Sequence, residues 1–262
     1  MNLDLSQKRA IVCGSTHGIG KAVAMELASL GADVILVARN KENLLIVKSE
    51  LDTSKGQNHD IIVADFSFPE DLKVKMQNYI SLNKEVDILV NNTGGPAGGP
   101  IVEAKTEDFI QTFSNHLLCN HIMVQAVIES MKNKQSGRII NIISTSVKQP
   151  LKGLGVSNTI RAAVANWAKT LSLELAPCGI TVNNVLPGAT NTVRLSSLIE
   201  AKANKTGHST SFLKEEMLKE IPAGRFAEAW EIANAVAFLA SPAAAYINGI
   251  NIPVDGGRTG CL

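Results

Sequence analysis

The chain has 262 residues, of which 45% are hydrophobic, so it is long enough to bury a large core. Lysine and arginine number 25 against 24 aspartates and glutamates, and no block of basic residues marks a surface for nucleic acid or anionic lipid. We therefore expect a small-molecule partner, and we expect neither nucleic acid nor a membrane to be bound.

The amino-terminal segment lacks the features of a secretory signal, because isolated leucines stand among acids, amides and bases. The most apolar stretch, residues 232–247, is interrupted by Ser241 and Pro242, and it is shorter than the roughly 20 apolar residues that a membrane span needs. Four cysteines are scattered without CxxC spacing, and the five histidines form no HExxH motif. These observations predict a cytoplasmic protein without a metal site.

Short runs rich in valine and isoleucine alternate with longer segments of helical period along the chain. This alternation predicts an α/β fold of the Rossmann type, a doubly wound parallel sheet with helices on both faces. No strand pattern is left over for a second domain, so residues 1–262 are expected to form a single domain. The seven expected strands cover residues 9–13, 33–38, 60–64, 86–91, 137–144, 180–186 and 249–254.

One interval, from about residue 190 to residue 221, departs from the regular alternation. Two amphipathic pieces, residues 192–203 and 211–221, predict a helical insertion over one end of the sheet. The insertion is either an excursion without a function or a lid. The lid is favoured, because ligands bind at the carboxyl ends of parallel strands.

A glycine-rich turn joins the first expected strand to a helix that begins near Gly18. Glycines in such a turn let the backbone approach a pyrophosphate, and the helix N-terminus offers free N–H groups to it. A glycine triplet alone is weak evidence, but here it has the strand, turn and helix context that dinucleotide binding requires. The expected cofactor contacts in this turn are Gly14, Ser15, Thr16, His17, Gly18, Ile19 and Gly20.

The second expected strand leads into Arg39, nineteen residues after Gly20. An acid at this place would bind the 2′-hydroxyl of NAD, whereas an arginine accommodates the 2′-phosphate of NADP. Asp33 begins that strand and so lies at its far end. The sequence therefore favours NADP(H) over NAD(H). The alternative is that Arg39 is a solvated surface base and His17 a turn residue that binds no ligand.

Motifs along the chain, in order, are GSTHGIG, ADF, LVNNTGG, GRIINIIS, GITVNNVLPG, IPAGR and VDGG. Together they resemble the short-chain dehydrogenase/reductase family over nearly the full chain, and they look most like its 3-oxoacyl-(acyl-carrier-protein) reductases. The resemblance implies an NADP-dependent oxidoreductase that reduces a 3-oxoacyl thioester or a related ketone by hydride transfer, in fatty acid metabolism. It also implies a homotetramer or a homodimer.

The same resemblance assigns further cofactor contacts. They are Asp65 and Phe66 at the adenine, Asn92 and Gly94 along the nicotinamide ribose, and Pro187, Gly188, Thr190 and Thr192 beside the nicotinamide amide. The alternatives are that Asn92 only forms hydrogen bonds within its loop, and that Pro187 and Gly188 only form a turn.

The family's catalytic set is an asparagine, a serine, a tyrosine and a lysine, and this chain matches it only in part. Ser144 corresponds to the serine, whereas Ser157 stands thirteen residues later at the tyrosine position and Arg161 four residues further at the lysine position. The asparagine position falls at His116, or at Asn115 if the register shifts by one. Neither tyrosine of the chain is followed by a lysine four residues later, so the pair has not moved elsewhere.

These departures predict a slow reductase. A serine hydroxyl is a far weaker acid than a phenol, whose pKa is about 10, while an arginine keeps its charge and can still hold a ribose or a developing oxyanion. His116 offers one rescue, because an imidazole that titrates near neutrality could feed a proton through water to Ser144 or Ser157.

Two alternatives stay open for the altered set. Ser157 could simply cap a helix and Arg161 could be a solvated residue of its first turn, although an arginine there opposes the helix dipole. The protein could also bind NADP with little or no redox turnover and act as a sensor or as a partner subunit.

Overall fold

The computed structural model describes residues 1–82 and 85–261. Its parallel sheet has the strand order β3-β2-β1-β4-β5-β6-β7, which confirms the seven expected strands. The direction of winding reverses between β1 and β4, the place where doubly wound sheets bind their ligands. The strands are β1 (Arg9–Cys13), β2 (Asp33–Ala38), β3 (Asp60–Val63), β4 (Ile88–Asn91), β5 (Gly137–Ile142), β6 (Ile180–Pro187) and β7 (Asn251–Val254).

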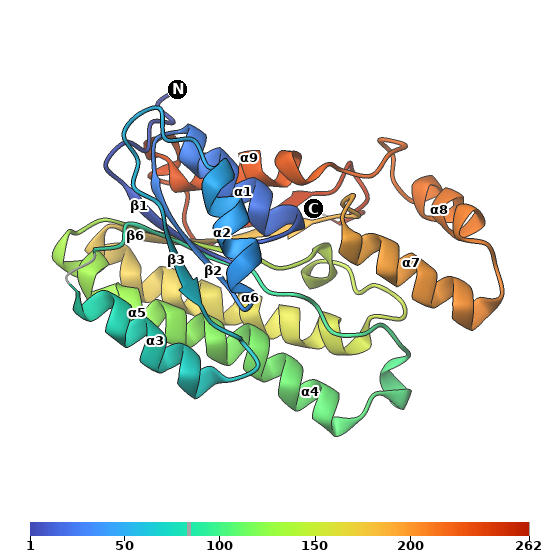
Figure 1. Ribbon diagram of the computed structural model, residues 1–262. Helices are drawn as coiled ribbons and strands as arrows, with labels where there is room; N and C mark the ends of the chain where they lie inside the picture. The colour runs from blue at the N-terminus through green and yellow to red at the C-terminus, as the bar shows by residue number, and fades with distance from the viewer. Residues whose placement is uncertain (83–84, 262) are drawn as a thin grey trace.

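Helices cover both faces of the sheet, as expected (Figure 1). One face carries α1 (Gly18–Ser29), α2 (Lys41–Glu50) and α9 (Ala229–Ala240). The other carries α3 (Pro69–Ser81), α4 (Thr106–Phe113), α5 (Cys119–Asn133) and α6 (Gly155–Leu175), with a π-helical turn, η2 (Ser114–Leu118), between α4 and α5. The predicted helical insertion is present as α7 (Val193–Thr206) and α8 (Thr210–Lys219), which extend beyond the sheet at the right of Figure 1.

The central strands are apolar on both sides, because helices bury both faces of a doubly wound sheet. In β1, Val12 belongs to the core shared with α1, α2 and α9, and Ile11 belongs to the core shared with α3, α5 and α6. Leu36 and Ile35 divide in the same way in β2. Each such side chain contributes about 1.5–3 kcal/mol on full burial, so these two cores hold the sheet rigid beneath its carboxyl end.

A ladder of four asparagine side chains crosses β4 to β7, and the first three of them are buried. Asn91 donates to Asn141 (2.9 Å), Asn141 to Asn184 (2.9 Å) and Asn184 to Asn251 (2.8 Å), in each case from Nδ2 to Oδ1. These residues are direct partners in the strand register. Because a shift by one residue would turn each amide to the opposite face, the ladder fixes the register of the strands that carry the candidate site.

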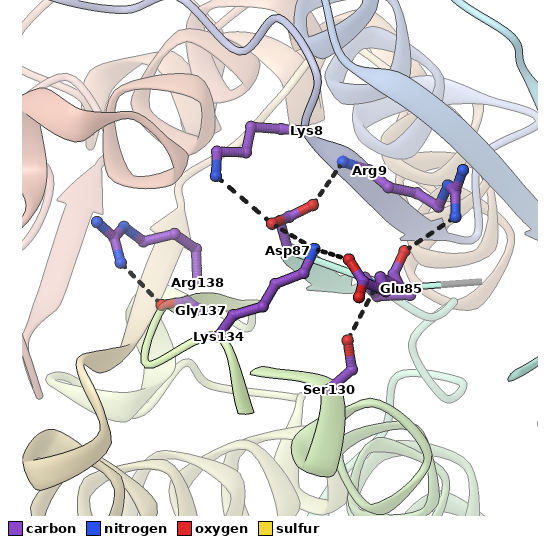
Figure 2. Close-up of polar contacts among 9 residues, drawn as sticks. Lys8, Arg9, Glu85, Asp87, Ser130, Lys134, Gly137 and Arg138 are labelled. Carbon is purple, nitrogen blue, oxygen red and sulfur yellow. Dashed lines mark hydrogen bonds and ion pairs between the residues drawn. The ribbon is translucent and has the colours of Figure 1, made fainter. Parts of the chain in front are cut away.

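Asp87 connects the amino-terminal ends of the central strands, opposite the candidate site (Figure 2). Its side chain is buried and accepts hydrogen bonds from the Arg9 backbone N–H (3.0 Å) and from Lys134 Nζ (3.1 Å), with Lys8 Nζ at 3.5 Å. Its backbone also bonds to Arg9 and to Arg138. Asp87 thus ties the start of β4 to the start of β1 and the end of α5 through its carboxylate, and to β1 and β5 through its backbone.

No helix within residues 1–82 and 85–261 is both long enough and apolar enough to cross a membrane. Within the same residues, no three His, Cys, Asp or Glu side chains are grouped so that they could hold a metal ion. The four cysteines lie in the described part of the chain, and all are free thiols.

Replacing Asp87 by Asn keeps the shape of the side chain but removes the charge that the two lysines share. Because hydrogen bonds to charged groups contribute about 1.5–3 kcal/mol each, we expect Asp87→Asn to lower the free energy of unfolding by about 1–3 kcal/mol in urea titrations. Asp71→Asn is the matched control, since Asp71 is an exposed residue of α3 paired with Lys75 (2.7 Å). Equal unfolding free energies for the two variants would contradict the role given to Asp87.

Candidate active site

The glycine-rich turn between β1 and α1 packs tightly against Asn92, just after β4. A Cβ on Gly14 would lie 2.7 Å from the Asn92 carbonyl oxygen, and a Cβ on Gly20 would lie 2.1 Å from the Gly14 carbonyl oxygen. Gly14 and Gly18 also adopt positive φ angles, 60° and 52°. Asn92 Nδ2 donates to the carbonyl oxygen of Cys13 (3.3 Å). Asn92 therefore holds the glycine turn by hydrogen bonds that reach from its own loop to the end of β1, and it also borders the cavities described next.

A first cavity of about 450 Å³ lies between this turn and the ends of β2 and β3. Arg39 and Asn40 border it at the end of β2, where a 2′-phosphate of NADP would lie. No acid follows β2 directly, whereas Asp65 follows β3 and borders the same cavity. The predicted cofactor residues that line the first cavity are Gly14, Thr16, His17, Arg39, Asp65, Phe66, Asn92 and Gly94.

A second cavity of about 420 Å³ adjoins the first, and both are lined by Gly14, His17, Asn92, Thr93 and Gly94. Together they form a groove along the carboxyl end of the sheet that crosses the point between β1 and β4. An extended dinucleotide fits such a groove, because its pyrophosphate would lie at the glycine turn. The predicted residues that line only the second cavity are Gly18, Ile19, Ser144, Ser157, Arg161, Pro187, Gly188, Thr190 and Thr192.

The structure leaves three predicted residues outside these two cavities. Ser15 is fully buried, and its hydroxyl donates to the carbonyl oxygen of Val37 (3.5 Å), so its side chain contacts β2 instead of the groove. Gly20 packs on Gly14. His116 borders a neighbouring cavity of about 370 Å³. The Ser15 side chain is therefore turned away from the groove, and the expected contact of Ser15 with the cofactor stays a prediction that involves its backbone.

Arg161 is a buried residue, with 9% of its surface exposed. Its Nη1 donates to the carbonyl oxygen of Ile142 (2.9 Å), while its Nε has no hydrogen-bond partner among the described residues. Burial, and then the charge of Arg194, lower the pKa of Arg161 to about 10, so the guanidinium keeps its charge at neutral pH. The alternative that Arg161 is a solvated surface residue is wrong.

Ser157 lies inside α6 and does not cap it. The helix begins at Gly155, and its N-cap residue is Leu154. Ser157 stands one turn before Arg161, so both side chains lie on the same face of α6 and border the second cavity. The alternative that Ser157 is the helix cap is wrong.

Ser144 borders the same cavity two residues after the end of β5. Its Oγ accepts the backbone N–H of Ser146 (3.1 Å), which leaves the hydroxyl proton available to another acceptor. The structure thus brings three of the four predicted catalytic residues, Ser144, Ser157 and Arg161, to one cavity, and it places the fourth, His116, beside the neighbouring cavity.

His116 occupies the π-helical turn η2, a type of turn that frequently marks functional sites. Its Nδ1 is 2.5 Å from the hydroxyl oxygen of Thr93. Burial, and then the charge of Arg161, lower the pKa of His116 to about 2, so the ring is neutral at neutral pH. The expectation that it titrates near neutrality is wrong. Its neighbour Asn115 accepts a hydrogen bond from Gln111 (2.7 Å) and borders the first cavity.

Helix α7 lies over the second cavity and is attached to the glycine-rich loop 94–100. The Arg194 guanidinium donates to the carbonyl oxygen of Pro96, and Lys205 Nζ, near the end of α7, lies 3.5 Å from Glu103. Arg194 also borders the second cavity, and the sequence alone did not identify it. One sequence feature could have done so: it is an arginine in the first turn of a helix, where its charge opposes the dipole.

A family model described as enoyl-(acyl carrier protein) reductase matches residues 14–259. The chain belongs to the short-chain dehydrogenase/reductase family. The groove across β1 and β4 lies at the place where doubly wound sheets bind a dinucleotide.

Relatives in this family match the chain over nearly its full length. The chain is 36% identical over 250 residues to the 3-oxoacyl-(acyl-carrier-protein) reductase FabG of Haemophilus influenzae, which covers 95% of this chain and 97% of that protein. It is 32% identical over 254 residues to the NADPH-dependent reductase BacG of Bacillus subtilis, with coverage of 97% and 98%. The L-sorbose reductase from Gluconobacter frateurii, complexed with NADPH and L-sorbose, superposes with a TM-score of 0.92 at 29% identity, covering 100% of both chains.

The lowered pKa of His116 predicts a pH dependence of stability. The ring stays neutral in the folded protein down to about pH 2, whereas an unfolded histidine titrates near 6.5. The unfolded state therefore binds the extra proton first, so this contribution to stability is complete above pH 6.5 and falls by about 1.4 kcal/mol per pH unit below it. We expect His116→Gln to flatten the fall in unfolding free energy between about pH 7 and pH 5 in urea titrations.

His208→Gln is the control, because His208 is exposed in the loop between α7 and α8. It is expected to leave the slope of stability against pH as in the parent protein. A slope for His116→Gln that matches the parent protein would show that the His116 imidazole protonates within the fold.

Proposed function

We propose that the protein is an NADPH-dependent reductase that converts the carbonyl of a 3-oxoacyl thioester or a related ketone into an alcohol. The observation that carries this proposal is the groove that joins a cavity bordered by Arg39 to a second cavity bordered by Ser144, Ser157 and Arg161. The names of the relatives FabG and BacG support ketone reduction and NADPH. When bound, the cofactor supplies the hydride.

Arg39 supports the choice of NADPH over NADH. It borders the first cavity at the end of β2, and the residue after it, Asn40, caps α2 by accepting the backbone N–H of Asn43 (2.8 Å). Neither residue would repel a 2′-phosphate, and Arg39 would neutralise it. Asp65 and Phe66 border the same cavity from the end of β3, where an adenine ring could pack on Phe66.

At the reacting end, Ser144 and Arg161 act on the carbonyl oxygen. Ser144 offers a hydroxyl donor, and the buried charge of Arg161 stabilises the negative charge that develops on that oxygen during reduction. Since the pKa of Arg161 is about 10, the guanidinium does not release its proton at neutral pH. The proton that completes the hydroxyl comes from water, so that ketone, NADPH and a proton give alcohol and NADP⁺.

One observation favours a second candidate function, an NADP-binding protein with little or no redox turnover. The described residues that line the second cavity include no tyrosine, lysine, cysteine, aspartate or glutamate. Loss of a general acid costs about 10²- to 10⁴-fold in rate. A slow reductase and an NADP-binding sensor or partner subunit therefore differ only in how fast they reduce a ketone. The measured rate of NADPH oxidation decides between them.

We further propose that the protein is a single-domain, cytoplasmic homodimer or homotetramer that acts in fatty acid metabolism. Both apolar cores rest on the same sheet, which supports one dinucleotide-binding domain over residues 1–262. Exposed apolar side chains of α4 and η2, Ile110, Phe113 and Leu118, support a homodimer or homotetramer that would cover them. The free cysteines support a cytoplasmic location, and the relative FabG supports a place in fatty acid metabolism.

The test is NADPH oxidation with a panel of 3-oxoacyl thioesters and simple ketones, with NADH as the comparison. We expect slow, saturable turnover with NADPH. Ser157→Tyr would place a phenol one helical turn from Arg161, whose charge lowers the phenol's pKa. We therefore expect Ser157→Tyr to raise kcat about 10- to 100-fold, part of the contribution that a general acid makes.

Ser157→Phe is the matched control, because it adds the same ring without the hydroxyl. Equal kcat values for the tyrosine and phenylalanine variants would contradict the view that only the acid is missing. If NADPH binds but neither the parent protein nor Ser157→Tyr turns over any ketone, the second candidate function holds instead.

A further inference from the structure

The second cavity holds more positive charge than its surroundings neutralise. Arg161 is nine-tenths buried, and its Nε lacks a hydrogen-bond partner among the described residues. Burial lowers the pKa of both Arg161 and Arg194, and no described carboxylate acts to raise either one. No aspartate or glutamate stands among the described residues that line this cavity. The charge of the pair is thus left for a ligand to neutralise.

The two guanidinium groups converge on one place, beside Gly95. A Cβ on Gly95 would lie 3.4 Å from Arg194 Nη2 and 3.8 Å from Arg161 Nη2. Arg194 lies in the first turn of α7, and this turn contains no acidic residue. The positive end of the helix dipole therefore adds to the positive electrostatic potential beside Gly95. Two like charges from α6 and α7 therefore border one small volume.

Other arginines near this region are paired with carboxylates. Arg258, which also borders the second cavity, donates to Glu220, and Arg225 forms two hydrogen bonds of 2.7 Å with Glu231. Of the arginines that line the second cavity, Arg161 and Arg194 thus have no carboxylate partner among the described residues, and both donate to backbone carbonyl oxygens instead. Arg161 is buried whereas Arg194 is exposed to solvent. A buried charge without a counterion is costly, and a bound anion removes that cost at Arg161.

We propose that Arg161 and Arg194 bind a carboxylate of the substrate, so that the preferred substrate is a keto acid in preference to a neutral ketone. This rests on the proposed function, since it names the substrate class of the same site. A carboxylate accepts paired, charge-assisted hydrogen bonds from guanidinium groups, which suits the two Nη2 atoms beside Gly95. Leu151, Leu154, Leu198 and Met217 line the rest of the cavity, so the substrate has an apolar body.

The phosphates of the cofactor are the other anions that could reach this pair. Thr192, which caps α7, approaches the glycine turn, since a Cβ on Gly18 would lie 3.1 Å from Thr192 Cγ2. The start of α7 is therefore close to the expected pyrophosphate. The experiment must separate binding of a substrate carboxylate from binding of a cofactor phosphate.

The test uses calorimetric titration of the protein saturated with NADP⁺. The probes are the carboxylates 2-oxobutanoate and 3-oxobutanoate and their neutral methyl esters. We expect each carboxylate to bind at least about tenfold more tightly than its ester, because charge-assisted hydrogen bonds are lost in the ester. Arg194→Gln is expected to abolish this preference, and Arg194→Lys, which keeps the charge, to retain part of it. Lys202→Gln is the matched control, since it removes one exposed charge from the same helix and is expected to change nothing.

Equal binding of carboxylates and esters by the parent protein would overturn the proposal, as would an unchanged preference in a folded Arg194→Gln variant. A variant that binds NADP⁺ more weakly but keeps the preference would assign the pair to a cofactor phosphate and would also overturn it. Because this titration needs no turnover, a failure of the proposed reductase activity is observed separately, as absence of NADPH oxidation.

Discussion

The buried positive charge of Arg161 constrains the rest of the site. The carbonyl oxygen of Ile142 accepts one of its hydrogen bonds, but no described carboxylate pairs with it. The neighbouring imidazole of His116 remains neutral, in part because a second buried cation there would be repelled. Arg194 adds a further positive charge from α7. The absence of acids among the described lining residues gives this end of the groove a preference for negative charge, whether on a developing oxyanion or on a ligand.

The position of the Arg161 charge is well defined because polar side chains fix the strands at both their carboxyl and their amino ends. The asparagine ladder holds β4 to β7 in register near the site. Asp87 holds together the starts of β1, β4 and β5 at the opposite end of the strands. Between them, the close packing of Gly14 on Asn92 shapes the turn at the start of α1. The site residues lie on the loops and helices that follow the strands, and the rigid strands support them. Such support allows hydrogen-bond donors to be preorganised toward a reacting oxygen.

Local patterns in the sequence were sufficient to predict the fold. Strand and helix periodicity is set by neighbouring residues, so the seven strands and the insertion of α7 and α8 could be predicted. The errors are one or two residues at the ends of β3, β4, β5, β6 and β7. Motif spacing likewise predicted that Ser144, Ser157 and Arg161 share one site, and they line one cavity. The family resemblance added the positions at the ends of β3 and β4.

What the sequence could not predict depends on contacts between distant segments. The neutrality of His116 follows from burial and from the charge of Arg161, forty-five residues later in the chain. The inward turn of Ser15 follows from its contact with β2, and the convergence of Arg194 on Arg161 follows from the position of α7. Helix periodicity alone did not show whether Arg161 is solvated or enclosed. The structure shows that it is buried.

Chemical rescue of Arg161→Ala tests most directly whether the guanidinium acts in the reaction. The account predicts that this variant loses about 10²- to 10³-fold in the rate of ketone reduction, the usual cost of one electrostatic donor, while it remains folded and binds NADPH. Guanidinium chloride at millimolar concentrations should restore part of that rate in a saturable way, and sodium chloride at equal ionic strength should not. A folded variant that reduces ketones as fast as the parent protein, or one whose lost rate guanidinium does not restore, would contradict the account.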